Sequence, residues 1–203
     1  MKTQPQIGLI LLAAGESRRM GSPKQILRFE GETLLRRAAR AAVESDCRPV
    51  IVVLGAGAEI LRNELERLPV EIAVNRDWPD GMGGSIRAGL ERLLEIDVEV
   101  EAAIITVCDQ PAVSAGVIGR LIEKYLKTGA LIVASAYART LGVPALFDRR
   151  IFSELKELPP GSGAKMLIER YSAEVVSVPF PEGAIDIDTP EDYRRMRDQS
   201  RER

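Results

Sequence analysis

The sequence has 203 residues, of which 45% are hydrophobic and none is histidine, and 28 basic against 30 acidic side chains leave a formal net charge of −2. Without histidine the chain has no Ser-His-Asp or Cys-His catalytic pair, no histidine general base and no histidine-ligated metal. The near-neutral charge argues against a nucleic-acid partner, and two cysteines are too few for a disulfide framework or a four-cysteine zinc site.

The same numbers favour one globular domain over residues 1–203, because the hydrophobic content can fill a full core. The apolar run over residues 7–14 is too short to span a membrane, and no signal-peptide pattern precedes it. The low cysteine content is typical of a reducing compartment. We therefore expect a cytoplasmic protein with no membrane partner.

Short apolar segments alternate with helical patterns through the first two thirds of the chain. In chain order we expect a strand over 7–13, a helix over 33–43, a strand over 50–54, a helix over 58–67, a strand over 70–75, a helix over 84–94, a strand over 102–107, a helix over 117–127 and a strand over 130–135. The strands are continuously apolar, as in strands buried on both faces. Alternating strands and helices predict βαβ units, hence a three-layer α/β fold with a mostly parallel central sheet.

The pattern weakens after residue 139. There we expect a strand over 143–147, helices over 149–158 and 164–171, a strand over 174–178 and a closing helix over 190–197. Prolines and glycines concentrate in this part, for example at 159–161 and 181–183. We expect it to form a lid over the sheet and to bind the acceptor of any transferred group.

The loop after the first strand, residues 12–24, carries a pattern typical of phosphate binding. Gly15 and Gly21 let the backbone approach a phosphate closely, and successive N–H groups in such a loop form an anion-binding nest. The segment does not have the pattern of a Walker A loop. A solvated Gly/Ser turn without a ligand is the alternative interpretation. Fixed positive charge comes from Arg18, Arg19 and Lys24. We interpret the segment as a triphosphate-binding loop.

Three aspartates are candidates for holding a divalent metal. Asp109 directly follows the fourth predicted strand, and in a 3-2-1-4 strand order that strand neighbours the first, so Asp109 should face Lys24 across the crevice. This position suits Mg²⁺ on an α-phosphate. Asp186 and Asp188 are two apart in an extended segment, so both side chains share one face, and the sequence does not decide which would bind the metal.

Polar groups near residues 75–89 are candidates for contacts with a ribose or base. Asn75 ends the third predicted strand, and the glycines of residues 81–89 precede a predicted helix start, where backbone N–H groups are free. We assign such contacts to Asn75, to the N–H of Gly83 and to the hydroxyl of Ser85. A glycine-rich helix cap and an ordinary polar strand end are the alternatives.

A G-x-G pair at Gly55 and Gly57 follows the second predicted strand and imitates a dinucleotide-binding fingerprint. Ile60 occupies the position of the third glycine, and no acidic residue ends the next strand at the expected distance. We interpret this segment as an ordinary strand-to-helix turn.

The segment L-A-A-G-E-S-R-R-M-G-S-P-K-Q, residues 12–25, resembles the signature of the MobA/MocA-like nucleotidyltransferases, which have a Rossmann-like NTP transferase fold. The resemblance continues in the same order through residues 81–89, 108–111, 161–165 and 186–192, nearly the whole chain. It implies that the base and phosphates lie against Leu12, Ala13, Ala14 and Gly15. It implies catalytic roles for Arg19, Lys24 and Asp109, with Mg²⁺ held by Asp109 and by Asp186 or Asp188.

The resemblance also implies a substrate pair. L-A-A-G is more similar to the cytidylyltransferase branch than to the guanylyl branch, which has L-A-G-G, so CTP is the expected donor among NTPs, and molybdenum-bearing molybdopterin the expected acceptor. A sugar- or polyol-phosphate acceptor stays open, because Val143 stands where many members have histidine and residues 161–163 lack the usual acid. A NAD(P)-dependent oxidoreductase and a non-catalytic carrier of molybdenum cofactor are further alternatives. A molybdenum hydroxylase or its maturation factor is the expected protein partner.

Overall fold

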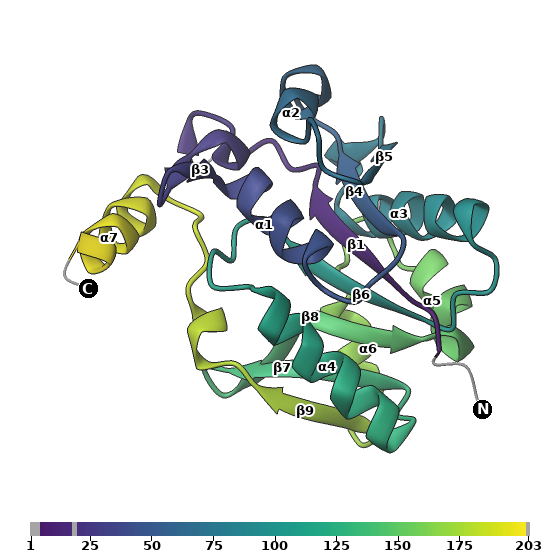
Figure 1. The fold of residues 1–203 in the computed structure, drawn as a ribbon. Helices are drawn as coiled ribbons and strands as arrows, with labels where there is room; N and C mark the ends of the chain where they lie inside the picture. Colours follow the sequence, from purple (N-terminus) through teal and green to yellow (C-terminus); the bar gives the residue numbers. More distant parts are fainter. Residues whose placement is uncertain (1–4, 18–19, 202–203) are drawn as a thin grey trace.

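The computed structural model describes residues 5–17 and 20–201, and the side chains among them up to residue 198. A seven-stranded sheet forms the centre, in the spatial order β5-β4-β1-β6-β8-β7-β9 (Figure 1). Strand β8 is antiparallel to β6 and β7, whereas the other pairings in this sheet are parallel. The strands are β1 Ile7–Ala13, β4 Val50–Leu54, β5 Glu71–Val74, β6 Ala102–Val107, β7 Ile132–Tyr137, β8 Thr140–Asp148 and β9 Val175–Pro179.

The first half of the sheet has the strand order predicted from the sequence. In chain order its strands are arranged 3-2-1-4, with β1 between β4 and β6. Leu12 of β1 pairs with Val53 on one side and with Val107 on the other. All residues of β1 and β4 are buried, which agrees with their continuous apolar sequences. The loops after β1, β4 and β6 therefore leave the sheet at one edge.

Helices cover both faces of the sheet and complete the three-layer α/β fold. One core contains the buried side chains of α1 Leu34–Val43, α2 Ala58–Glu64 and α4 Ala115–Thr128. The other contains those of α3 Met82–Ile96, α5 Phe152–Lys156 and α6 Lys165–Arg170. The starts of α1 and α4 are set by Thr33 and Ser114, whose hydroxyls accept hydrogen bonds from backbone N–H groups of the first turn.

The expectation of a lid after residue 139 is wrong for most of that segment. β8 and β9 continue the central sheet together with β7, and α5 and α6 pack on the face that α3 covers. β8 is also longer than predicted, because its pairing to β6 and β7 extends the strand around Pro144 to both sides. The buried sequence Ala145–Phe147 anchors it in the core.

Several short elements escaped the sequence analysis because they are too short for a periodic pattern. They are the hairpin β2 Arg28–Phe29 with β3 Glu32–Thr33, and the 3₁₀ helices η2 Lys24–Ile26, η3 Trp78–Asp80 and η5 Pro181–Ala184. The helix expected over 149–158 is present as the 3₁₀ helix η4 Arg149–Ile151 followed by α5. The closing helix α7, Pro190–Arg201, lies beside this hairpin (Figure 1). Leu34, Ile187 and Met196 form a small separate apolar cluster there. None of the helices in the described part of the chain is long and apolar enough to cross a membrane.

Two helical glycines should respond oppositely to alanine. A Cβ on Gly89 would lie 2.9 Å from Cγ2 of Val53 and even closer to Ile10, so Gly89→Ala should lower the free energy of unfolding by about 1–3 kcal/mol. Nothing lies within 4 Å of a Cβ on Gly119, so Gly119→Ala should raise it by about 0.5–1 kcal/mol. Urea unfolding measures both values, and a stabilising Gly89→Ala would contradict the close approach of α3 to the sheet.

Candidate functional site

A lysine and two aspartates from three distant parts of the chain meet at the carboxyl edge of the sheet. Lys24 begins η2, Asp109 follows β6, and Asp188 precedes α7. Nζ of Lys24 forms an ion pair with Oδ2 of Asp109 and lies 3.0 Å from Oδ1 of Asp188. The three side chains are 15%, 19% and 36% exposed, respectively, so the group is half-buried but open to a ligand. The expected juxtaposition of Lys24 and Asp109 is present.

The position of Asp188 is set by the residue before it. The backbone N–H of Ile187 donates to the carbonyl of Asp109 at 3.0 Å, and the Ile187 side chain is fully buried beside Leu34 and Met196. After it, the carboxylate of Asp192 accepts a hydrogen bond from the Thr189 N–H at 2.9 Å. The acid is therefore held between a packed isoleucine and a capped helix.

Asp186 faces a different neighbour. Desolvation by the surrounding protein, and then the negative charge of Asp109, raise the pKa of the Asp186 carboxyl above its usual value, although the amide of Gln110 lowers it in part. Asp188, in contrast, forms an ion pair with Lys24. The geometry thus separates two acids that the sequence left equivalent, and Asp188 is the one that completes the cluster with Lys24.

One oxygen of this cluster lacks a partner. Oδ1 of Asp109 is buried without a hydrogen bond, while Oδ2 is engaged by Lys24. A buried carboxylate oxygen without a donor is costly and is commonly satisfied by a bound ion or ligand. Among the described residues no three acids or cysteines lie close enough to hold a metal by themselves. The cluster therefore suits a cation such as Mg²⁺, which takes few protein carboxylates and completes its shell with phosphate and water oxygens.

Lys24 keeps its positive charge in this setting. Burial alone would lower the pKa of its ammonium group, but the charges of and hydrogen bonds to Asp109 and Asp188 raise it above its ordinary value. The side chain is therefore a fixed cation at neutral pH. A fixed cation at this edge can neutralise phosphate charge.

The side chain of Gln25 holds the loop after β1 by hydrogen bonds. No role was predicted for this residue from the sequence. Its Nε2 donates to the carbonyls of Ala13 at 3.0 Å and Gly15 at 2.7 Å. Its Oε1 accepts from the hydroxyl of Ser17, which in turn accepts from the Lys24 N–H. The residue is only 1% exposed. Its place at the end of the motif over residues 12–25 is the one sequence feature that marks it, because the burial of a single amide leaves no periodic pattern.

A cavity of about 520 Å³ opens beside this loop. It is lined by residues 15–17 and 21–23 and by Ala56 and Gly57 of the next loop. Gly15 is exposed and contributes only backbone. Arg18 and Arg19, predicted to bind phosphate, lie outside the described residues. The cavity thus lies beside the loop for which the sequence predicts phosphate binding.

The other residues predicted to line the nucleotide are in the core. Leu12 and Ala13 are buried on opposite faces of the sheet, and the carbonyl of Ala14 accepts from the Ala56 N–H at 3.1 Å. Their side chains therefore anchor the start of the loop in the core. A ligand would contact the loop beyond them through backbone groups.

The G-x-G pair has a packing explanation, as expected for an ordinary turn. A Cβ on Gly55 would lie 2.7 Å from both the Ala14 carbonyl oxygen and Cβ of Trp78. Gly57 has φ +67° at the N-terminus of α2, a conformation that favours glycine. Both glycines are thus required by the fold itself.

The structure brings Asn75 and Ser85 together and gives Gly83 another role. Nδ2 of Asn75 donates to Oγ of Ser85 at 3.0 Å, and a cavity of about 400 Å³ adjoins Asn75 and Gly84. The N–H of Gly83, predicted to be free for a ribose, instead donates to the carbonyl of Pro160 at 2.9 Å. That prediction is wrong because the loop around Pro160 packs directly on the start of α3.

Removing the amide of Gln25 should destabilise the loop after β1. Gln25→Met keeps the approximate volume but leaves the carbonyls of Ala13 and Gly15 without donors, at a cost of about 2–4 kcal/mol in the free energy of unfolding. Urea unfolding measures the cost. Gln6→Met, at an exposed position, is the control and should change it by less than about 0.5 kcal/mol. Equal effects of the two variants would contradict the role given to Gln25.

Comparisons with known proteins find relatives that match nearly the whole chain. The chain is 30% identical over 203 residues to nicotine blue oxidoreductase of Paenarthrobacter nicotinovorans, covering 95% of this chain and 97% of that protein. It is 25% identical to the molybdenum cofactor cytidylyltransferase of Escherichia coli K12, covering 92% and 93%.

Among solved structures, Rv0371c of Mycobacterium tuberculosis H37Rv superposes with a TM-score of 0.82 at 28% identity, covering 97% of this chain and 99% of that one. A manganese complex of Rv0371c superposes with a TM-score of 0.77 at 26% identity, covering 95% and 98%. The family model described as MobA-like NTP transferase domain matches residues 9–175. The chain belongs to the MobA-like NTP transferase family.

Proposed function

We propose that the protein transfers a nucleotidyl group, CMP from CTP, to the phosphate of molybdenum-bearing molybdopterin and releases pyrophosphate. The observation that carries the proposal is the cluster of Lys24, Asp109 and Asp188 beside the phosphate loop, with one carboxylate oxygen left for a cation. The similarity to a molybdenum cofactor cytidylyltransferase over nearly the full length supports the choice of substrates.

The transfer is an in-line displacement at the α-phosphorus. An oxygen of the acceptor phosphate forms the new bond to phosphorus, the bond to the bridging oxygen of the β-phosphate breaks, and pyrophosphate leaves with that electron pair. The acceptor phosphate is already ionised at neutral pH, so no general base is needed, in keeping with a chain that contains no histidine. Lys24, and Arg19 by its place in the family motif, neutralise the phosphate charges.

Asp109 and Asp188 are the residues that we assign to Mg²⁺, with Asp186 close enough to influence it through its charge. The ion supplies charge neutralisation and orientation of the α-phosphate. The manganese complex of Rv0371c supports a divalent ion in this fold. When the nucleotide binds, the protein holds the Lys24 ammonium between the two carboxylates and the phosphates of the nucleotide.

CTP preference and base contacts rest on two features. The motif carries Ala14 rather than glycine, and this alanine packs under the loop against Gly55. The paired polar groups of Asn75 and Ser85 adjoin a cavity and are the side chains we assign to the base or ribose. In the cell, cytoplasm is the proposed location, and a molybdenum hydroxylase or its maturation factor would receive the product.

An oxidoreductase is the second candidate, because the chain resembles nicotine blue oxidoreductase over nearly its whole length. The close packing at Gly55 and the positive φ of Gly57 explain both glycines without a dinucleotide and weigh against such a site at that turn. A non-catalytic carrier of molybdenum cofactor is the third. NADPH binding without nucleotide turnover would favour the oxidoreductase, and cofactor binding without turnover would favour the carrier.

Two substitutions in the charged cluster test the transfer. Lys24→Ala and Asp109→Asn should each lower the rate of pyrophosphate release with CTP, Mg²⁺ and molybdenum-loaded molybdopterin by about 100-fold or more, since each removes a charge next to the reacting phosphates. GTP, ATP and UTP in parallel reactions test the preference for cytosine.

Lys127→Ala is the matched control for this test, because Lys127 forms an exposed ion pair with Glu123 far from the cluster, and it should leave the rate unchanged. Circular dichroism establishes that each variant is folded. Turnover that survives in folded Lys24→Ala or Asp109→Asn would overturn the roles assigned to these residues.

A further inference from the structure

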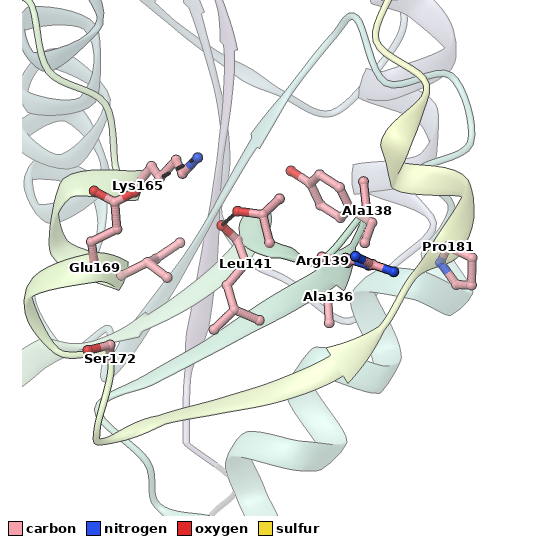
Figure 2. A pocket seen from close by; sticks show the side chains of 11 residues that line it. Ala136, Ala138, Arg139, Leu141, Lys165, Glu169, Ser172 and Pro181 are labelled. Carbon is pink, nitrogen blue, oxygen red and sulfur yellow. Dashed lines mark hydrogen bonds and ion pairs between the residues drawn. The ribbon is translucent and has the colours of Figure 1, made fainter.

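A cavity of about 640 Å³, which the transfer chemistry above does not use, lies between the β7–β8 hairpin and α6 (Figure 2). Its volume is in the range of small-molecule sites. Lys165 and Glu169 of α6 lie on one side, Arg139 and Pro181 on the other, and Leu141 between them, as Figure 2 shows. The wall is mostly apolar, with two cationic side chains at its borders.

The tip of the hairpin holds Arg139 in an unfavourable backbone conformation. Tyr137 pairs with Thr140, so Ala138 and Arg139 alone form the turn, with φ +46° and +61°. Turns with two positive φ values strongly prefer Asn-Gly, because residues with a Cβ are strained there. Arg139 is exposed at the cavity and has no ion-pair partner among the described residues. Strain kept at a ligand-sized cavity is a mark of function.

The cavity is joined to the charged cluster through Tyr137. A Cβ on Gly142 would lie 3.0 Å from Cζ of this ring, and a Cβ on Gly183 would lie 2.9 Å from its Cδ1, so the two glycines make room for it. The hydroxyl donates to the Val143 carbonyl at 3.1 Å and accepts from the amide of Gln110, the residue after Asp109. Tyr137, which lines the cavity, is thus hydrogen-bonded to the residue next to Asp109.

The second cation is only partly neutralised. Nζ of Lys165 lies 3.8 Å from Oε1 of Glu169, and both side chains are exposed. Such a long surface pair contributes little to stability. Lys165 is therefore available to a stronger anion, and Glu169 weakens the attraction.

We propose that this cavity binds the part of the acceptor remote from the reacting phosphate, and that it selects an apolar, ring-sized body carrying a second anionic group, held by Arg139 and Lys165. That this ligand is the acceptor rests on the proposed function. That the cavity binds an anion carried on a ring is independent of the proposed function.

Binding of a probe tests the cavity directly. In calorimetric titrations of the full chain, 1-naphthyl phosphate should bind at least about tenfold more tightly than 1-naphthol or inorganic phosphate, because only the first combines ring and anion. Arg139→Ala and Lys165→Ala should each weaken its binding about tenfold. Arg170→Ala, which removes an exposed arginine paired with Glu154, should have no effect.

The location of the probe follows from one more variant. Weaker binding in Lys24→Ala, with unchanged binding in Arg139→Ala and Lys165→Ala, would put the probe in the phosphate loop and overturn the proposal. Unchanged binding in Lys24→Ala, with loss in the other two, supports it.

Two further variants separate recognition from a structural role. Glu169→Gln should lower the Kd of 1-naphthyl phosphate about two- to threefold, since it removes the negative charge beside Lys165. Arg139→Gly should raise the midpoint of thermal unfolding, because glycine relieves the strained turn, and should still weaken the probe. Binding equal to that of the unchanged chain in Arg139→Gly would show that the cation has no role and overturn the proposal.

Steady-state kinetics link the cavity to the transfer. Arg139→Ala and Lys165→Ala should raise KM for molybdenum-loaded molybdopterin about tenfold and leave KM for CTP unchanged. An unchanged acceptor KM would overturn the assignment of the cavity to the acceptor. No pyrophosphate release by the unchanged chain with any nucleotide would instead refute the proposed function, and the probe titrations would then decide on the cavity alone.

Discussion

The pairing of β1 with β4 on one side and β6 on the other is the constraint on which the candidate site depends. Both ladders are parallel, and Leu12 pairs with Val53 and Val107, so the three strands end at the same level. The loop after β1, the turn at Gly55 and the carboxylate of Asp109 emerge there side by side. Open α/β sheets bind their ligands at this edge, and here the register of one buried strand determines which groups can meet.

Among the described residues, acids outnumber cations at that edge. Lys24 stands against the carboxylates of Asp109 and Asp188, with Asp186 nearby. A half-buried group with more acids than cations attracts positive charge and repels a bare triphosphate. A nucleotide that arrives together with a divalent cation resolves both problems. The neighbouring carboxylates raise the pKa of Lys24. Desolvation first, and then the charge of Asp109, raise the pKa of the Asp186 carboxyl.

The sequence was sufficient for part of this arrangement. The strands over 7–13, 50–54 and 102–107 were predicted at their exact bounds, because uninterrupted apolar runs admit few alternatives. The contact between Lys24 and Asp109 followed from strand order. The long β8 and the bond from the Gly83 N–H to Pro160 did not follow, since each depends on segments remote in sequence. Gln25 escaped because periodicity reports apolar burial and carries no signal for a buried amide.

The small apolar cluster of Leu34, Ile187 and Met196 is separate from the two main cores. Elements that pack in a satellite cluster can open while the rest of a domain stays folded. An excursion of α7 that withdraws Ile187 would carry Asp188 away from Lys24 without disturbing the sheet. The fraction of molecules in which Asp188 meets Lys24 would then be set by a local opening equilibrium. Any ligand that engages Asp188 would shift that equilibrium towards the assembled state.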